Sequence, residues 1–222
     1  MKRLTWLDAA APPDAFPPVS MALDDPPGLL AAGGDLSAQR LIAAYNQGIF
    51  PWYSAGEPVL WWCPDPREVL FPQELHVSRN LRRCLKRQEY TVTENHDFAA
   101  VITACGQRGT CNGSTGNGTW ITPEMNAAYC QLHRQGVALS IEVWQQHELV
   151  GGLYGVRAGA VFCGESMFSR RDNASRVALH WLAGHCAERG ITLIDCQMPS
   201  AHLRSMGSRP LPRNEFLAIL RG

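Results

Sequence analysis

The sequence has almost no lysine and no long hydrophobic run. Only Lys2 and Lys86 are lysines, so nearly all positive charge is carried by arginine. No apolar run approaches the ~20 residues that a membrane-spanning helix needs. The first residues also lack the apolar segment of a secretory signal. We therefore expect a cytoplasmic protein with no membrane contact.

Paired cysteine motifs are also missing. The eight cysteines occur singly, without C-x-x-C and without a Cys/His spacing typical of zinc sites. They are best interpreted as reduced thiols in the core, and no metal site is predicted. Cys163 or Cys196 as a nucleophile stays open, although neither has a histidine close in sequence.

The sequence also has no excess of positive or of negative charge. The 222 residues carry a formal net charge of zero, with 45% hydrophobic and 18% charged residues. This composition supports a folded core and excludes a disordered chain. It also excludes a globally basic nucleic-acid binder, but it allows a local basic patch.

The chain divides into two parts by composition. Residues 1–35 are rich in Pro, Ala, Asp and Gly, which predicts irregular chain on the surface. A helix is expected over 37–47, with Asp35 or Ser37 as its N-cap. An aromatic, proline-rich stretch follows. We place the boundary after residue 65, which gives a small N-terminal domain, 1–65, and a larger domain, 66–222.

Helices and strands alternate in the second part. Strands are expected near 68–71, 90–93, 138–144, 148–156, 160–168 and 191–197. Helices are expected near 78–88, 97–105, 122–136, 174–189, 201–206 and 214–221. This order predicts an α+β fold with a mixed, mostly antiparallel sheet. A helix, a three-stranded meander, a helix and a strand suit acyltransferases that resemble N-acetyltransferases (GNAT-like), although order alone is weak evidence.

Polar residues interrupt two of the apolar strands. Asp195 and Gln197 lie two positions apart in the last strand, and Glu165 interrupts the strand over 160–168. In an extended strand, residues two apart point to the same face. A buried carboxylate must be paired, hydrogen-bonded or functional. The two strands therefore predict one shared site, although a hydrogen-bonded pair with a structural role is an equally good interpretation of Asp195 and Gln197.

A cluster of basic residues occupies the helix over 78–88. Four of its cations recur at i, i+3, i+4 and i+7, which places them on one helical face. Phosphate would relieve their mutual repulsion, whereas a solvated basic face is the alternative. The five residues are Arg79, Arg82, Arg83, Lys86 and Arg87. Tryptophan is the other candidate, because Trp120 follows a glycine-rich loop and could stack on a base.

With these stretches together, the sequence resembles the leucyl/phenylalanyl-tRNA–protein transferases, bacterial enzymes of the N-degron pathway. The matching stretches run in order along the chain and are specific only jointly. They include Gly33-Gly34-Asp35-Leu36-Ser37, Gly48-Ile49-Phe50-Pro51-Trp52, Trp61-Trp62-Cys63-Pro64-Asp65-Pro66-Arg67, Gly118-Thr119-Trp120, Phe162-Cys163-Gly164-Glu165-Ser166-Met167-Phe168 and Leu193-Ile194-Asp195-Cys196-Gln197.

The resemblance implies transfer of Leu, Phe and, more weakly, Met from aminoacyl-tRNA to proteins that begin with Arg or Lys. It implies a GNAT-like C-terminal domain, no cofactor and a monomer. Asp195 and Gln197 would form a catalytic relay to the attacking amine, and Glu165 would bind the acceptor's first residue. Trp52 and Trp120 would hold the 3′ adenosine. The aminoacyl side chain would contact Leu153, Phe162, Met167 and Leu182, and the basic helix would bind the tRNA acceptor stem.

Three other functions remain possible at this stage. A CoA-dependent N-acetyltransferase would need a glycine-rich turn, which the stretch 169–173 lacks. A non-catalytic tRNA-binding module would have no use for Glu165, Asp195 and Gln197. A peptidoglycan aminoacyltransferase would also use charged tRNA, but the matching stretches do not indicate a cell-wall acceptor.

Overall fold

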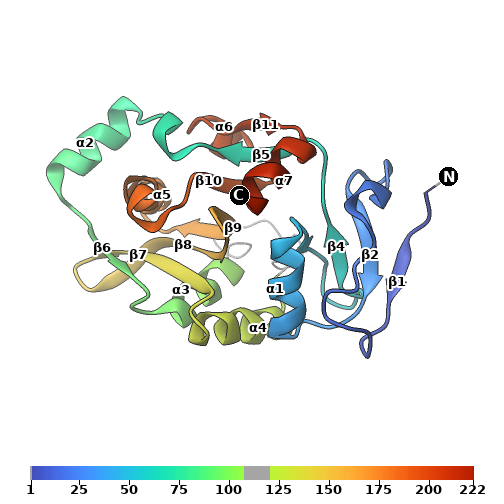
Figure 1. Cartoon of the computed structure of the whole chain (residues 1–222). Helices are drawn as coiled ribbons and strands as arrows, with labels where there is room; N and C mark the ends of the chain where they lie inside the picture. Colours follow the sequence, from blue (N-terminus) through green and yellow to red (C-terminus); the bar gives the residue numbers. More distant parts are fainter. Residues whose placement is uncertain (1, 108–120) are drawn as a thin grey trace.

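The computed structural model describes residues 2–107 and 121–222, which form two β-sheets with helices packed against them (Figure 1). The smaller sheet has the strand order β1-β2-β4-β3. Its strands are β1 (Thr5–Leu7), β2 (Leu29–Gly33), β3 (Phe50–Pro51) and β4 (Leu60–Trp62).

The larger sheet has the order β11-β5-β10-β9-β8-β7-β6. Its strands are β5 (Arg67–Leu70), β6 (Thr91–Glu94), β7 (Ala138–Gln145), β8 (Glu148–Ala158), β9 (Val161–Ser169), β10 (Leu193–Gln197) and β11 (Arg209–Leu211). β10 runs parallel to β9, and the other neighbouring pairs are antiparallel. The predicted α+β class with a mixed, mostly antiparallel sheet is confirmed.

Several of the helices begin directly after a capping side chain. The α-helices are α1 (Ala38–Asn46), α2 (Arg79–Arg87), α3 (Phe98–Gly106), α4 (Pro123–Arg134), α5 (Ala174–His185), α6 (Ala201–Arg204) and α7 (Arg213–Arg221). Three short 3₁₀ turns are η1 (Val19–Met21), η2 (Pro72–Glu74) and η3 (Ala187–Arg189). Ser37, Ser78, Asp97 and Thr122 each accept a backbone N–H from three residues further on, which satisfies one free donor of α1 to α4.

The two faces of the larger sheet are covered by different helices. α5 packs on one face and contacts α2, whereas α3 and α4 lie on the other, beside α1 (Figure 1). Neighbouring residues of β8 show this alternation, because Leu153 belongs to the core under α5 and Tyr154 to the core under α3 and α4. The core under α3 and α4 also contains Leu30 and Trp61 of the smaller sheet, so the packing is continuous across residue 65. The domain division itself stays a prediction.

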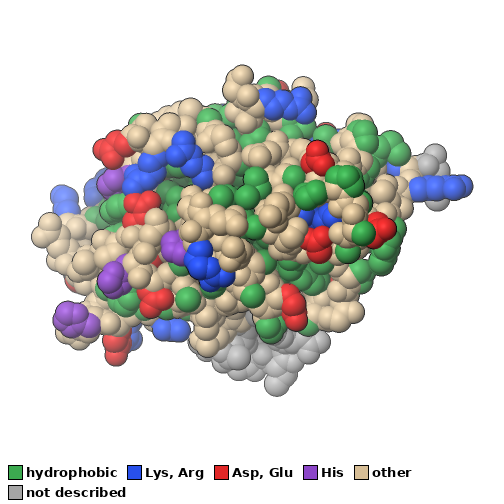
Figure 2. Space-filling view, turned by 60° about the horizontal axis from the view of Figure 1, so that its bottom comes forward, with side chains coloured by type: hydrophobic (Ala, Val, Ile, Leu, Met, Phe, Trp, Pro, Cys, Tyr) green, Lys and Arg blue, Asp and Glu red, His purple; other side chains and the backbone are tan. Residues whose placement is uncertain are grey.

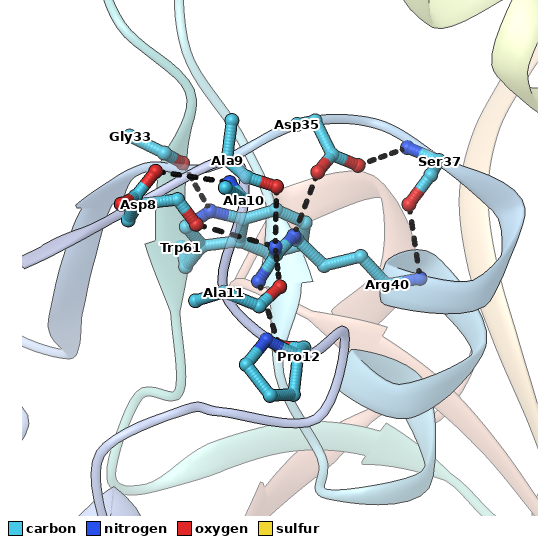
Figure 3. A network of polar contacts seen from close by, with 10 residues as sticks. All are labelled: Asp8, Ala9, Ala10, Ala11, Pro12, Gly33, Asp35, Ser37, Arg40 and Trp61. Carbon is cyan, nitrogen blue, oxygen red and sulfur yellow. Dashed lines mark hydrogen bonds and ion pairs between the residues drawn. The ribbon is translucent and has the colours of Figure 1, made fainter.

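The segment over residues 2–35 is only partly irregular, which corrects the prediction of irregular chain over residues 1–35. This segment contains β1, η1 and β2, and every residue of β2 is buried. Five consecutive apolar residues are too few to show a period, but their buried backbone requires hydrogen bonds, which β1 and β4 supply. Arg40 of α1 fixes the neighbouring loop by donating to the carbonyl oxygens of Asp8, Ala9, Ala11 and Pro12 and to the Asp35 carboxylate (Figure 3).

Candidate functional site

A pocket of about 390 Å³ lies where the parallel strands β9 and β10 stop pairing. Their register ends with Asp195 opposite Cys163. Glu165 and Gln197 come just after this last pair, and both line the pocket. The structure therefore brings the polar residues of the two strands to one site, as the sequence predicts. The remaining lining comes from β3, β8, α5 and the segment around α6.

Asp195 and Gln197 are not related by simple strand alternation. Asp195 lies opposite Val69 and Gln197 opposite Glu68, so two steps on β10 match one step on β5. Gln197 also has a positive φ of 62°. This bulge overturns the expectation of two side chains side by side on one face. Instead, the backbone N–H of Gln197 donates to Oδ1 of Asp195 at 2.8 Å.

Glu165 is the centre of a buried hydrogen-bond cluster. Its Oε1 accepts from the hydroxyl of Tyr45 at 2.7 Å and from Nε2 of Gln197 at 2.6 Å. Its Oε2 accepts from the hydroxyl of Tyr129 at 2.9 Å. Burial raises the pKa of Glu165 to about 7, although these hydrogen bonds act in the opposite direction. The site therefore holds a carboxyl group that changes charge near neutral pH.

The two tyrosines were not predicted from the sequence as site residues. Tyr45 comes from α1 and Tyr129 from α4, and their hydroxyl oxygens lie 2.5 Å apart. Burial, with the nearby Glu165, raises the pKa of both hydroxyls well above the ordinary value, so both remain neutral donors. In the sequence, each tyrosine occupies a position on the buried side of its helix. That pattern is equally typical of a core residue, so sequence alone gives no distinguishing signal.

Arg67 is a third site residue that the sequence did not predict. Its Nε and Nη2 donate to the two carboxylate oxygens of Asp195 at 2.8 and 2.7 Å. Both side chains are almost completely buried. Burial is the largest single effect on the pKa of Arg67 and lowers it, but the charge and hydrogen bonds of Asp195, together with Cys63 and Cys163, outweigh burial and raise the pKa. An arginine inside the buried stretch Arg67–Leu70 was the available signal, because a buried cation requires a partner.

The wall of the pocket is largely apolar and agrees with most of the expected residues. Leu153, Phe162 and Met167 line it, together with Trp52. Leu182 does not line the pocket. It is buried in α5 within the same core as Leu153, and Leu179, almost one turn earlier, reaches the pocket instead. Residues three to four positions apart lie on the same face of a helix, so the periodicity of α5 did not determine whether Leu179 or Leu182 lines the pocket.

Trp52 lies at the rim of the pocket, where the residue is 40% exposed. Its ring packs against Trp62 with ring centres 5.7 Å apart. The indole N–H of Trp62 donates to the backbone carbonyl of Trp52 at 2.7 Å, which fixes the backbone at this position. Trp120, the other expected aromatic, lies outside the described residues.

The basic helix α2 is separate from the pocket. All five of its cations are exposed, and Leu81 is its buried residue. Arg87 pairs with Glu89 at 3.3 Å, whereas no carboxylate of the described chain lies within ion-pair distance of Arg79, Arg83 or Lys86. Figure 2 shows positive and negative side chains interspersed over the face that it draws. The predicted local concentration of positive charge on α2 is thus exposed and mostly unneutralised.

Cysteine chemistry and metal binding receive no support from the geometry. Burial raises the pKa of both Cys163 and Cys196, which disfavours the reactive thiolate. Within residues 2–107 and 121–222, no group of three or more His, Cys, Asp or Glu side chains could hold a metal ion. No helix in the same part of the chain is long and apolar enough to cross a membrane.

Comparison with known proteins identifies the family. The family model described as leucyl/phenylalanyl-tRNA protein transferase matches residues 69–221, and the model of its N-terminal domain matches residues 34–65. A leucyl/phenylalanyl-tRNA–protein transferase from Pseudomonas aeruginosa strain UCBPP-PA14 is 56% identical over 217 residues, covering 98% of this chain and 93% of the relative. One from Azotobacter vinelandii is 58% identical over 203 residues, or 91% and 88% of the two chains.

Two solved structures align with this chain at low similarity. A GCN5-related N-acetyltransferase from Kribbella flavida aligns with a TM-score of 0.39 at 13% identity, over 76% of this chain and 58% of the other. L-PGS from Bacillus licheniformis aligns with a TM-score of 0.42 at 9% identity, over 77% and 53%. Scores this low carry no argument about function. The sequence matches cover nearly the whole chain, and on that evidence it belongs to the leucyl/phenylalanyl-tRNA–protein transferase family, aminoacyltransferases that move an amino acid from tRNA to a protein.

Proposed function

We propose that this chain transfers Leu, Phe and, more weakly, Met from aminoacyl-tRNA to the α-amine of proteins whose first residue is Arg or Lys, marking them for N-degron degradation. The observation that carries the proposal is the pocket beside β9 and β10, which combines an apolar wall with the buried carboxyl group of Glu165, which has no cationic partner in the cluster described above. An unbranched or γ-branched apolar side chain fits the wall. A cationic first residue is complementary to Glu165.

The apolar wall is suited to several amino acids at once. Leu153, Phe162, Met167 and Leu179 offer no hydrogen-bonding side chain, so the wall discriminates mainly by shape. One methylene in such a pocket is worth only about 1–3 kcal/mol. Such a wall is compatible with acceptance of Leu and Phe and weaker acceptance of Met, and it rejects β-branched side chains by steric overlap. Trp52, exposed at the rim, is the proposed stacking surface for the 3′ adenosine, with Trp120 as its proposed partner.

The transfer needs little chemical assistance, because an aminoacyl ester is already activated. The amine nitrogen forms a bond to the ester carbonyl carbon, the bond to the ribose oxygen breaks, and that oxygen receives the proton that the amine gives up. The main requirement is to hold two substrates in register. No cofactor enters this scheme.

Gln197 is the proposed orienting group for the amine. Its Nε2 donates a hydrogen bond to Glu165, which leaves its Oε1 as an acceptor for the amine N–H. A carboxamide is too weak a base to hold the proton near neutral pH. Glu165, with a pKa of about 7, is suited to that task as well as to binding a cationic first residue. Asp195 contributes by fixing the backbone of Gln197.

The acceptor stem is proposed to bind along α2. Arg79, Arg83 and Lys86 are exposed and have no carboxylate partner among the described residues, so phosphate can reach them. Phosphate contacts position a nucleic acid without reading its sequence. This suits an enzyme that accepts several charged tRNAs. A cytoplasmic monomer remains our expectation.

One transfer assay tests the proposal. The purified protein is incubated with radiolabelled Leu-tRNA and a peptide that begins with Arg. The controls are the same peptide acetylated at its N-terminus and one that begins with Glu. Label should enter only the free Arg peptide, and RNase treatment of the tRNA should abolish it. Equal labelling of the Glu peptide would overturn the proposed acceptor. No transfer to any peptide, with tRNA still bound, would overturn the proposed reaction.

A further inference from the structure

The buried ion pair between Arg67 and Asp195 has no direct place in the transfer chemistry just described. Each side chain is at most 1% exposed, and the two are joined by a pair of hydrogen bonds. Replacing such a pair by apolar residues is often neutral or stabilising. Stability alone is therefore a weak reason for a charged pair at this position, one residue before the bulge of β10.

Two aromatic rings lie close to the guanidinium of Arg67 and restrict its movement. The ring of Phe50 lies 4.6 Å from its central carbon and the ring of Phe216 lies 4.7 Å from it. Phe50 belongs to β3, two residues before Trp52, and Phe216 belongs to α7. The guanidinium group of Arg67 thus cannot move away from Asp195 without displacing aromatic side chains from two other elements.

The pair connects directly to the reacting end of the pocket. Oδ1 of Asp195 accepts from Nε of Arg67 at 2.8 Å and from the backbone N–H of Gln197 at 2.8 Å. Gln197 has a left-handed backbone, a conformation that costs energy for a residue with a side chain. From that backbone its side chain reaches Glu165.

We propose that Arg67 is a positioning residue for aminoacyl transfer, in which its guanidinium fixes Asp195 and Asp195 fixes the bulged backbone that aims Gln197 at the amine. This inference rests on the proposed function of Gln197. Arg67 does not touch either substrate. Lysine cannot replace it, because an ammonium group does not supply two parallel donors in a fixed plane.

The test compares the Arg67→Lys variant with Gln197→Ala and with the double variant. Arg67→Lys keeps the charge and should lower kcat by about 10- to 100-fold, the usual cost of a small misplacement. The KM for aminoacyl-tRNA should change by less than about threefold, because the pocket wall and α2 are untouched. The double variant should be no slower than Gln197→Ala alone, because both changes remove the same alignment.

Arg40 provides a matched control. It is also 1% exposed and donates to several oxygens, but its partners are the loop over residues 8–12 and Asp35, away from the pocket (Figure 3). Arg40→Lys should lower the melting temperature and leave kcat of the folded protein unchanged. A wild-type kcat in Arg67→Lys would overturn the proposal, as would rate losses that multiply in the double variant.

A neutral pair covers the case in which Arg67→Lys does not fold. Arg67→Met combined with Asp195→Asn leaves no buried charge unpaired. It should melt close to the wild type and still show the lowered kcat. A neutral pair with wild-type kcat would contradict the inference. Absence of transfer in the wild-type enzyme would contradict the proposed function itself, so the two failures are distinguishable.

Discussion

The side-chain amide of Gln197 lies 2.6 Å from Glu165, and only the backbone N–H of Gln197 reaches Asp195. The two carboxyl groups of the site therefore have different surroundings. Asp195 is paired with a buried cation, whereas Glu165 is surrounded by neutral donors. One carboxylate is thus suited to hold the backbone, and the other is suited to respond to protons and to a cationic substrate.

Stability should depend on pH through Glu165. Burial raises its pKa from 4.5 to about 7, so the folded protein keeps a proton that the unfolded chain releases above about pH 4.5. Between these values folding takes up a proton, and the free energy of unfolding should fall as the pH rises toward 7. The slope is at most about 1.4 kcal/mol per pH unit. Urea unfolding at pH 5, 6 and 7 measures it. Glu165→Gln should lack this component, and an identical slope in the variant would contradict the assignment.

Asp195→Asn should affect both folding and turnover. It leaves Arg67 buried without its anion, which costs about 3–5 kcal/mol when a buried pair is broken. Well below the melting temperature, kcat should be strongly reduced while tRNA binding stays nearly intact, because α2 is separate from the pocket. Melting curves, filter binding and single-turnover transfer measure the three effects. Asp14→Asn, at an exposed position, is the control. An unchanged rate in Asp195→Asn would remove Asp195 from the mechanism.

Replacing Arg82 and Arg83 together by alanine should weaken tRNA binding and flatten its salt dependence. Each phosphate that the protein no longer neutralises reduces the slope of log K against log salt by about one. Both side chains are exposed on α2. Titrations at several salt concentrations measure the slope. Arg134→Ala changes an exposed arginine on α4, which packs on the opposite face of the sheet, and should leave the slope unchanged. An unaltered slope in the double variant would mean that α2 does not face the phosphates.

Replacement by alanine should change the stability of the fold in opposite directions at two glycines. A Cβ at Gly155 would meet the carbonyl oxygen of Cys163 and would lie 2.5 Å from the ring of Phe162. Gly155→Ala should therefore destabilise the fold by at least about 1–3 kcal/mol and displace Phe162 from the pocket wall. Gly184 in α5 has nothing within 4 Å of such an atom, so Gly184→Ala should stabilise by about 0.5–1 kcal/mol. Thermal melts of both variants check the signs. Equal effects would show that the space around Gly155 relaxes freely.

Local sequence determines most of the secondary structure of this chain. Ser37, Ser78, Asp97 and Thr122 were readable as helix starts because an N-cap acts on a donor only three residues away. The long strands β7 to β9 were readable because their apolar pattern continues over many residues. β2 was missed because five buried residues show no period, and its hydrogen-bond partners are remote in sequence.

The candidate site, like the secondary structure, has features that local sequence determines and features that it does not. The sequence by itself determined that Glu165, Asp195 and Gln197 interrupt apolar strands, and that α2 concentrates positive charge, because both are properties of neighbouring residues. Only the tertiary structure decided that Arg67, 128 positions away, neutralises Asp195, and that Tyr45 and Tyr129 converge on Glu165. Strand order and helix packing create these contacts, and neither leaves a local pattern. The same holds for the bulge at Gln197, which depends on the register of β10 against β5 rather than on the alternation within β10.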